Sequence, residues 1–445
     1  MLDQGAQVEE LEPYEPHENA PWTRSRAAHL LRRCGFDPDE ERLRRAVDEG
    51  PGKTIDRELA RARLPAPEEE IASAYRLSAT GNIEPLRAWW IGKILTSDSP
   101  LRQRMTLFWH DHFATSNRKV QSPRLMLEQH LALERRGLGS LGDLLLSMTR
   151  DPAMLLWLDG NESRRGAANE NYARELFELF ALGEGNYEET DIKEAARAFT
   201  GWAVQQDRAV FRTTRHDAGA KTVFGRTGKF SDEDIVDLCL EQEACARHVP
   251  GKLFLDLVGL PATPSVLDEL SRSFRRSGHD LAALVERILR SRVFHSDGAR
   301  RRRVRPPLEF VAGLVRPLEG ATDAFAVGRA LQAMGQTLFE PPSVEGWKQG
   351  RSWIDTTRLL ARYRAAERLT GPDSAPGLDA DALCRRHRLP STESAATFVM
   401  ELLLPEDGSS LGEIVLEEAC REPTPGAALR RSAFLVASSP QFQMT

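Results

Sequence analysis

Apolar and polar residues alternate along most of this chain with the period of an α-helix. The pattern is clearest between residues 168 and 202, where apolar side chains recur at intervals of three and four residues. The apolar positions are Tyr172, Leu176, Leu179 and Phe180 in the first half, and Ile192, Ala195, Ala196 and Phe199 in the second half. The stretch therefore predicts two amphipathic helices that each bury one face.

Residues that begin and end helices stand at the expected places around these apolar positions. Asn169 precedes the first set, where a short side-chain oxygen can accept a hydrogen bond from the amides of the first turn. Gly183 follows the last apolar residue of that set, where a left-handed backbone favours glycine. We expect the second helix to begin near Thr190 or Asp191.

The same pattern extends over nearly the whole chain and predicts a mainly α, multi-helix globular fold with one small β-hairpin near 208–226. The hairpin is expected to pair Val210-Phe211-Arg212 with Thr222-Val223-Phe224. Further helices are expected at 37–49, 53–63, 67–80, 83–97, 99–114 and 307–335, with four between 232 and 290 and four short ones between 379 and 443. The expected divisions are a flexible acidic arm (1–23), a helical main domain (24–370), a linker rich in turn-forming residues (371–378) and a C-terminal helical segment (379–445).

The composition is that of an ordinary soluble protein and narrows the function mainly by exclusion. The 445 residues are 41% hydrophobic and 28% charged, and the net charge of -6 argues against a general nucleic-acid binder. Five scattered cysteines without C-x-x-C spacing predict neither a disulfide framework nor a structural zinc site. No apolar run is long enough for a membrane span and no signal peptide is visible, so a cytoplasmic location is expected. The basic residues 300–303 and Arg305 are expected to form a solvated loop.

The polar face of the helix after Asn169 is the main candidate site. Its members are Asn171, Arg174, Glu175 and Glu178. They lie three, four and seven residues apart and therefore point the same way. One interpretation is a solvated face with ion pairs such as Glu170 with Arg174. The other is a functional site, because asparagine is a poor helix former and Asn171 needs a local reason for its position.

Histidines before and after this helix extend the candidate site. His110 and His112 are candidate ligands for a divalent metal, but two positions apart on a helix they lie about 200° apart and cannot both bind one ion. The alternative is a structural role, with a glutamate of the helix after Asn169 as the hydrogen-bond partner. His216 and Asp217 stand together in a loop and are either a catalytic pair or part of a turn.

Tryptophans complete the predicted ligand contacts. Trp109 and Trp347 are candidate ligand-binding residues. The prolines and glycines of residues 341–354 predict a rigid loop that carries Trp347 and Trp353. Tryptophans in such a loop usually fill the edge of a core and less often form the wall of a ligand site, so we expect both to anchor the loop on the helices.

Seven sequence blocks, in this order, resemble the bacterial family named domain of unknown function 1800. They are M-T-L-F-W-H-D-H-F-A-T (105–115), D-P-A-M-L-L-W-L-D-G (151–160), N-E-N-Y-A-R-E-L-F-E-L-F-A-L-G (169–183), E-A-A-R-A-F-T-G-W (194–202), H-D-A-G-A-K-T (216–222), P-P-S-V-E-G-W (341–347) and S-S-P-Q-F-Q (438–443). Asp111 and Ser343 stand where the family pattern has Asn, and Lys348 where it has Pro. The resemblance implies a partner of the sulfatase-like type, often encoded beside members of the family, and it implies no reaction.

Two functions fit these observations. The first is an enzyme, or a protein that binds a small ligand or a metal, with Arg174, Glu175, Glu178, His216 and Asp217 as the catalytic candidates and Asn169, Glu170 and Asn171 as ligand-binding candidates. Carboxylates and imidazoles suit a divalent metal or acid–base chemistry, and an arginine suits an anionic group. The second is a non-catalytic partner or assembly protein, in which the same residues form a buried ion-pair network. A pocket that reaches Glu175 and His216 favours the first, and a sealed network with every carboxylate paired favours the second.

Overall fold

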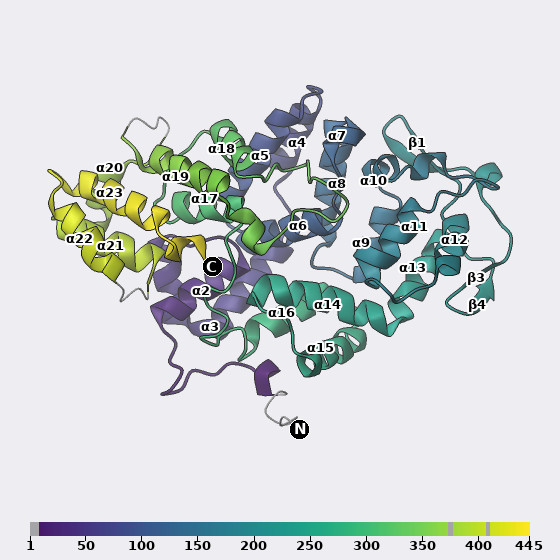
Figure 1. Ribbon diagram of the computed structural model, residues 1–445, viewed down its shortest axis with the longest axis horizontal. Helices are drawn as coiled ribbons and strands as arrows, with labels where there is room; N and C mark the ends of the chain where they lie inside the picture. Colours follow the sequence, from purple (N-terminus) through teal and green to yellow (C-terminus); the bar gives the residue numbers. More distant parts are fainter. Residues whose placement is uncertain (1–8, 373–376, 406–409) are drawn as a thin grey trace.

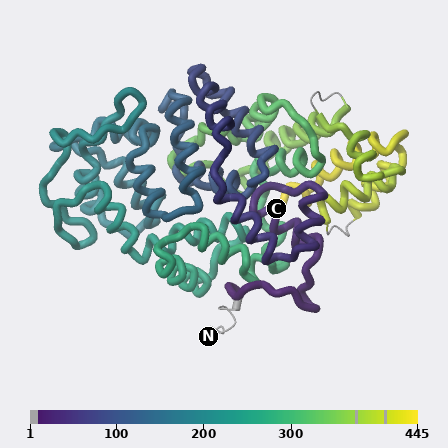
Figure 2. The backbone as a smooth tube through the Cα atoms, turned by 180° about the vertical axis from the view of Figure 1, so that it is seen from behind, coloured from purple at the N-terminus to yellow at the C-terminus, as the bar shows by residue number. Residues whose placement is uncertain are grey.

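The computed structural model describes residues 9–372, 377–405 and 410–445, and helices make up most of its regular structure. Helices α9–α13 and four short strands lie at one end of an elongated molecule, and α20–α23 lie at the other end (Figure 1). The view from behind shows the same order, with the N-terminal helices in the middle (Figure 2). The prediction of a mainly α fold is confirmed.

The N-terminal part supplies helices to the middle of the molecule. They are α2 (Arg24–Cys34), α3 (Glu40–Arg63), α4 (Glu68–Ser78), α5 (Ile83–Thr96), α6 (Pro100–His112), α7 (Asn117–Val120) and α8 (Pro123–Arg136), after a 3-10 turn at Glu9–Leu11. The side chains of Thr23, Asp39 and Ser122 accept hydrogen bonds from first-turn amides, which explains where α2, α3 and α8 begin. The two helices expected at 37–49 and 53–63 are the two segments of α3, which are separated by a kink because Gly50, with a φ of 80°, is non-helical and Pro51 follows it.

The next part forms one end of the molecule and the layer beneath α6. Its helices are α9 (Leu141–Thr149), α10 (Pro152–Trp157), α11 (Asn171–Glu175), a π-helix (Leu176–Ala181), α12 (Glu189–Ala198), α13 (Asp232–Glu241), α14 (Glu243–Val258), α15 (Pro264–Arg276) and α16 (Leu281–Arg290), with 3-10 turns at Gly160–Glu162 and Thr213–Arg215. The four helices expected between 232 and 290 are α13–α16.

The strands form two hairpins rather than the single one expected. β1 (Trp202–Gln205) pairs with β2 (Arg208–Phe211), and β3 (Lys221–Val223) pairs with β4 (Arg226–Gly228), each antiparallel. The predicted pairing of 210–212 with 222–224 is therefore wrong. Gln206 and Asp207, and likewise Phe224 and Gly225, all have positive φ, so each hairpin closes through its own two-residue turn.

The C-terminal part forms the other end of the molecule. Its helices are α17 (Pro307–Val315), α18 (Ala324–Ala333), α19 (Thr356–Thr370), α20 (Ala380–His387), α21 (Thr392–Leu403), α22 (Ser410–Cys420) and α23 (Pro425–Ser438), with 3-10 turns at Gly350–Trp353 and Gln441–Gln443. The single helix expected at 307–335 is two helices, because Pro317 and Gly320 fall between α17 and α18. The four helices expected between 379 and 443 are α20–α23. Residues 373–376 of the expected linker lie outside the described residues.

Two hydrophobic clusters hold these parts together, and the same helices contribute to both. Leu31 of α2, Leu107 of α6 and Leu131 of α8 belong to the cluster that extends to α17–α23. Leu30 of α2 and Trp109 of α6 belong to the cluster that extends to α9–α16. Helices α2, α6 and α8 therefore form the shared wall between the two halves. Among the described residues, no helix combines the length and apolar character that crossing a membrane requires.

The arm expected to be flexible is attached to the body over its described part, whereas residues 1–8 lie outside that part. The Tyr14 amide donates to the Arg290 carbonyl at 2.7 Å, and the Tyr14 ring stacks on His295 with 4.4 Å between ring centroids. The amide of Arg292 donates to the carbonyl of Glu12 at 2.9 Å. Residues 12–14 thus lie along the end of α16, directly after the 3-10 turn at Glu9–Leu11.

The basic segment before α17 is only partly the solvated loop that was expected, because Arg302 is exposed, Arg300, Arg301 and Arg303 are half-buried, and Arg305 is buried. Arg305 is 1% exposed and donates two hydrogen bonds to Asp37, of 2.7 and 3.2 Å. Its amide donates to the carbonyl of Gln443 at 2.8 Å, and Arg303 and Thr445 exchange backbone hydrogen bonds. The S-S-P-Q-F-Q block at the end of α23 is the partner of this basic segment.

Candidate functional site

The polar face predicted after Asn169 separates into a surface part and a half-buried part. Arg174 donates to both carboxylate oxygens of Glu189, at 2.7 and 2.9 Å, and to Glu170 at 3.4 Å. The side chain of Asn171 is exposed, and its amide donates to Oδ1 of Asn169 at 2.8 Å. The interpretation of helical ion pairs thus describes Arg174 and Glu170 well. Glu170, and not Asn169 as expected, is the N-cap residue of α11, although the Asn169 side chain accepts from the first amide of the helix.

His216 and Asp217 lie at a corner that joins two sequence blocks. The Arg197 guanidinium donates to both oxygens of Asp217, at 2.9 and 3.2 Å, and holds the pKa of that carboxyl down at about 2. Nδ1 of His216 lies 2.9 Å from the carbonyl oxygen of Thr200, whose hydroxyl accepts from the Asp217 amide. The geometry is that of a turn held by an ion pair, and neither residue contacts Glu175.

The two histidines of α6 have backbone partners on opposite sides of the helix. Nε2 of His110 accepts the Phe339 amide at 3.1 Å, and burial lowers the pKa of His110 to about 3. Nε2 of His112 donates to the Phe180 carbonyl at 3.1 Å. The expected partner of one histidine does come from the helix after Asn169, but it is a backbone carbonyl and not a glutamate. The described part of the chain contains no group of three or more His, Cys, Asp or Glu side chains arranged to hold a metal ion.

A π-helix interrupts the segment that the sequence predicts as one regular helix. The Leu182 amide donates to the Phe177 carbonyl five residues earlier, at 3.0 Å. The carbonyls of Leu179 and Phe180 instead accept from Nε2 of His248 and Nε2 of His112, respectively. π-helical turns are often found at functional sites. Here two imidazoles, one from α14 and one from α6, hold the wide turn in place.

Polar side chains connect α6 with α14, and we call this set the α6–α14 seam. Its members are Arg104, Asp111 and His112 on α6, and His248, Lys252 and Asp256 on α14. The spacings of four and eight residues on α14 put its three members on one face. Arg104 donates to both oxygens of Asp256 at 2.7 Å, and the His112 and His248 rings are 6.5 Å apart. A cavity of about 40 Å³ lies in the seam, lined in part by Arg104, Asp111 and Asp256.

Burial shifts the titration of the seam residues. It raises the pKa of Asp111 to about 6, against the opposing effects of the Trp347 amide and the Lys252 charge. It lowers the pKa of Lys252 to about 8 and that of His248 to about 4. Ionisable groups shifted in this way gather at functional sites more often than elsewhere. Among the described residues, Lys252 makes no hydrogen bond and no ion pair.

Asp111 fixes the P-P-S-V-E-G-W loop to the end of α6. Oδ1 accepts the Trp347 amide at 2.7 Å and Oδ2 accepts Nε2 of Gln349 at 2.9 Å, while Oε1 of Gln349 accepts the Trp353 indole at 3.2 Å. Gly346 has a φ of 81°, and a Cβ there would lie 2.3 Å from Oδ1 of Asp111. Both tryptophans are buried, at 5% and 3% exposure, which agrees with the expected role as anchors.

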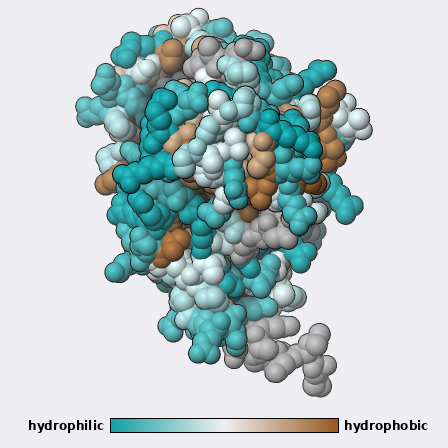
Figure 3. Space-filling view, turned by 90° about the vertical axis from the view of Figure 1, so that its left-hand side faces the viewer, coloured by the Kyte–Doolittle hydropathy of each residue, from teal (hydrophilic) through white to brown (hydrophobic). Residues whose placement is uncertain are grey.

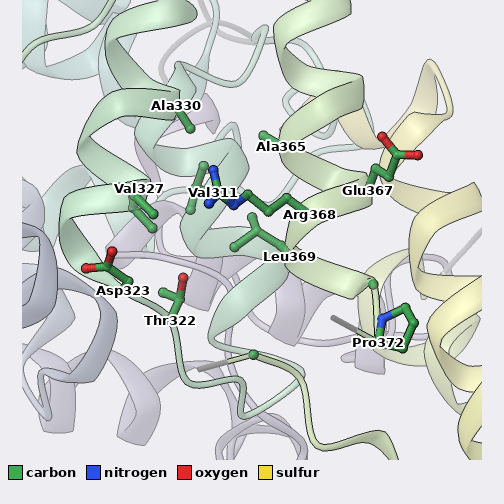
Figure 4. A pocket seen from close by; sticks show the side chains of 13 residues that line it. Val311, Thr322, Asp323, Val327, Ala330, Ala365, Glu367, Arg368, Leu369 and Pro372 are labelled. Atoms are coloured by element: carbon green, nitrogen blue, oxygen red, sulfur yellow. The ribbon is translucent and has the colours of Figure 1, made fainter. Parts of the chain in front are cut away.

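The outer side of this loop borders a groove of about 610 Å³. Its lining consists of Gly335, residues 342–348, Ser352, Trp353 and Arg358. A second pocket, of about 470 Å³, lies between Val327 and Ala330 of α18 and Ala365 and Leu369 of α19 (Figure 4). Pro372 and Gly377 also line that pocket, and residues 373–376 between them lie outside the described part of the chain. The groove beside the loop is therefore the better-defined space.

Of the remaining predicted site residues, Glu175 and Glu178 lie on the polar helix face, and Trp109 lies in the core. Glu175 is half-buried and has no hydrogen bond or ion pair among the described residues. Burial, then Glu178, and to a smaller extent Glu345 of the loop, raise its pKa. Glu178 accepts the Tyr187 hydroxyl at 2.8 Å. Trp109 is fully buried and donates its indole N–H to the Gly137 carbonyl at 2.7 Å, so it is a core residue and not a ligand contact.

Comparison with known proteins assigns the family without assigning an activity. The model of a family described as a protein of unknown function, DUF1800, matches residues 29–444. The chain belongs to this DUF1800 family. No curated protein and no solved structure matches it.

Three of the DUF1800 sequence blocks meet at the α6–α14 seam. They are the blocks at 105–115, 169–183 and 341–347, joined by the bonds of His112 and Asp111 described above. Sequence reasoning missed His248 and Lys252, which lie outside every block. Their signal was present in H-V-P-G-K-L-F-L-D, a polar residue at every fourth position of an otherwise apolar helix.

Proposed function

We propose that this DUF1800 protein binds a small organic ligand in the groove beside the P-P-S-V-E-G-W loop. The observation that carries the proposal is the groove itself, whose volume of about 610 Å³ lies within the roughly 300–1,000 Å³ of small-molecule sites. The loop that forms it is rigid, since Asp111 and two buried tryptophans fix it from behind. A preformed wall lowers the conformational entropy lost on binding.

The lining favours a ligand with a flat apolar body and an anionic group. Trp347 and Trp353 are both among the residues that line the groove. Arg358 is already engaged by the Ser352 carbonyl at 2.7 Å and by Asp355. The exposed amine of Lys348 has no hydrogen bond or ion pair among the described residues, which makes it the available cation.

Of the residues that the sequence proposes for catalysis, Glu175 fits this location best. Its raised pKa favours the protonated carboxyl, the form that a general acid requires. Arg174, His216 and Asp217 are occupied in ion pairs or turns. The proposal of ligand binding does not depend on a catalytic Glu175.

The test uses a fluorescent probe of the expected chemistry, 1-anilinonaphthalene-8-sulfonate, together with native mass spectrometry for any ligand that co-purifies. Lys348→Glu should weaken probe binding at least about tenfold, because it replaces the cation by a like charge. Lys229→Glu makes the same charge change at an exposed lysine outside the groove and should leave binding unchanged. Equal affinities for the two variants would contradict the groove as the binding site.

The partner hypothesis is supported by a different surface. Leu359, Leu360 and Tyr363 of α19 are 41%, 49% and 46% exposed, directly after the groove residue Arg358. Elsewhere, over the C-terminal end of the molecule, apolar side chains form separate small patches (Figure 3). Exposed apolar side chains that cluster are typical of protein contacts.

The partner implied by the family resemblance is a sulfatase-like protein, and co-purification with such a protein tests the hypothesis. Leu360→Glu should abolish co-purification. Leu64→Glu, at a 61% exposed leucine that directly follows α3, should not. Retention of the complex by Leu360→Glu would exclude this face of α19 as the contact.

A further inference from the structure

We propose that the open edge of β2, together with the arginines around it, binds an extended acidic segment of another polypeptide by β-strand addition. The surface belongs to the β1–β2 hairpin, at the opposite end of the molecule from α20–α23 (Figure 1). None of its residues lines the groove beside the P-P-S-V-E-G-W loop or belongs to α19. The inference therefore does not depend on either part of the proposed function.

The register of β1 and β2 fixes which main-chain groups point out of this two-stranded sheet. In an antiparallel sheet, pairs that exchange hydrogen bonds alternate with pairs whose amides and carbonyls point outward. The Arg212 amide donates to the Gly201 carbonyl at 2.7 Å, which makes this a bonded pair. Val204 and Ala209 lie three pairs further along the ladder and are therefore an outward-pointing pair. The contact of Val204 agrees, since its amide donates to Oδ1 of Asn161 at 2.6 Å.

The outward groups of β2 have no such partner. Ala209 and Phe211 direct their amides and carbonyls away from β1, and none of these four groups makes a hydrogen bond to another described residue. β1 packs on α10 and on the 3-10 turn at Gly160–Glu162, whereas β2 has only β1 as its neighbour in the sheet. Val210 and Phe211 are 36% and 41% exposed. The outer edge of β2 is therefore accessible to another strand.

Arginines surround this open edge. Arg208 begins β2, and Arg212 directly follows the strand. Arg164 and Arg165 stand in a loop beside them, since the Arg165 amide donates to the Arg215 carbonyl at 2.7 Å. Apart from Arg215, these side chains are exposed, and none of the exposed guanidinium groups has a hydrogen bond or ion pair among the described residues.

The local charge is opposite in sign to that of the whole chain. Segments 161–165 and 205–215 contain five arginines and two acidic residues, an excess of three positive charges, whereas the chain has a net charge of -6. Charges on a short edge strand can serve only to prevent aggregation. Protection alone does not explain why several unpaired charges of the same sign gather here in an acidic protein. Because they repel a second copy of the same edge, the partner that fits is acidic.

The main chain of the edge favours a polypeptide over a membrane or a nucleic acid. Ala209 and Phe211 each present an amide and a carbonyl, about 7 Å apart along the strand, which is the repeat of alternate residues in any extended chain. An added strand can bond all four groups, whereas phosphate groups only accept hydrogen bonds. Alternate side chains of the added strand lie beside Arg208 and Val210, so acidic residues at every second position fit best.

The experiment measures, by fluorescence anisotropy, how the full chain binds a labelled peptide in which glutamate and valine alternate. Ala209→Pro removes the outward amide, at a position where an edge strand tolerates proline. It should weaken binding at least about tenfold, whereas Ala209→Ser, which keeps the amide, should not change it. Arg208→Glu should also weaken binding at least about tenfold. Arg63→Glu reverses an exposed charge at the end of α3 and should have no effect.

A second probe needs no variant, so misfolding cannot obscure its result. The same peptide with N-methylated central amides keeps its charge but cannot donate to the edge, and it should bind the wild type at least about tenfold more weakly. Equal binding of the two peptides overturns the proposal, because charge alone then explains the contact. The proposal also fails if the wild type does not bind the unmodified peptide.

Vesicles that contain phosphatidylserine distinguish the other anionic partner. Vesicle binding that is tighter than peptide binding and unaffected by Ala209→Pro overturns the proposal and identifies an anionic membrane surface as the partner. Weak vesicle binding, with peptide binding that depends on the Ala209 amide, supports strand addition.

Discussion

At the scale of single residues, the unusual group is Arg33 of α2. It is 1% exposed, and none of its three guanidinium nitrogens has a hydrogen-bond partner within the described residues. Its charged neighbours are Arg104, Arg303, Asp256 and Glu309. Together with Arg33 they make three positive and two negative charges, so the group has one positive charge in excess. The guanidinium packs against Gly259 at the C-terminal end of α14, where the helix dipole offers some compensation.

This arrangement predicts opposite effects for two buried arginines. Arg33→Met should leave the free energy of unfolding unchanged or raise it by about 1–3 kcal/mol, because it removes an unpaired buried cation. Arg104→Met should lower it by about 3–5 kcal/mol, because it strips Asp256 and Glu309 of a shared partner. Urea denaturation of both variants is the measurement. A loss with Arg33→Met as large as that with Arg104→Met would mean that Arg33 has a partner, such as a bound anion.

The raised pKa of Asp111 predicts how the stability of the protein changes with pH. Its folded-state pKa of about 6 lies above the 3.8 of an unfolded chain, so the folded state binds the proton more tightly. The wild type therefore loses stability as pH rises from about 4 to about 6, by roughly 3 kcal/mol in total. Asp111→Asn cannot titrate, so its stability relative to wild type should rise by roughly 2–3 kcal/mol between pH 4 and pH 7.

The control for this prediction is Asp217→Asn. The pKa of Asp217 is lowered to about 2, so its stabilising contribution is lost only as pH falls below about 4. Its stability relative to wild type should be constant between pH 4 and pH 7. Denaturation of the wild type and both variants at several pH values is the measurement. If the stabilities of the wild type and Asp111→Asn change with pH in the same way, the Asp111 carboxyl is not desolvated.

At the scale of elements, the P-P-S-V-E-G-W loop depends on one close approach of backbone to side chain. A Cβ on Gly346 would lie 2.3 Å from Oδ1 and 2.6 Å from the carbonyl oxygen of Asp111. Gly350, four residues on, has a similar positive φ of 68° but meets nothing within 4 Å. Gly350→Ala should cost about 1 kcal/mol of strain, whereas Gly346→Ala should cost at least about 3 kcal/mol. Equal thermal midpoints for the two variants would show that the loop does not rest on Asp111.

The helices were predicted correctly where the spacing of apolar residues and the capping residues indicate the same boundaries, as for α13–α16 and α20–α23. It failed at the hairpins because Gln206-Asp207 and Phe224-Gly225 lack the usual sequence of a two-residue turn, so nothing local marked either one. It missed the π-helix because the wide turn is stabilised by His112 and His248, which are remote in sequence. In such cases the local structure depends on side chains that are remote in the sequence, and local sequence patterns cannot predict it.

The same reasoning explains what was found of the site. Trp347 and Trp353 were predictable as loop anchors, because large apolar rings between prolines and glycines must be buried somewhere. The grouping of Glu175 with His216 was not supported, since periodicity places residues on one helix face but does not say which loop comes to lie over it. His248 was missed because its partner, the Leu179 carbonyl, is remote in the sequence.

At the scale of the whole molecule, the S-S-P-Q-F-Q block connects the C-terminal helices to the middle of the fold. Phe442 is fully buried, with its ring 5.6 Å from that of Phe310 and 4.2 Å from the Arg305 guanidinium. The side chain of Gln443 accepts from Arg362 at 3.1 Å and donates to the Ala437 carbonyl at 2.8 Å. Through Arg305, this block is linked to Asp37 beside α2.

We therefore predict that the C-terminal helices and the rest of the chain unfold together. Phe442→Ala should lower the free energy of unfolding by about 3–5 kcal/mol, the usual cost of removing a buried aromatic ring. Phe325→Ala, at a phenylalanine that is 46% exposed on α18, should cost less than about 1 kcal/mol. Far-ultraviolet circular dichroism and tryptophan fluorescence should give coincident denaturation curves for the wild type, since the described tryptophans lie outside α20–α23. If the fluorescence curve of Phe442→Ala stays at the wild-type midpoint while part of the circular dichroism signal is lost earlier, the C-terminal helices form a separate folding unit and the proposed linkage is wrong.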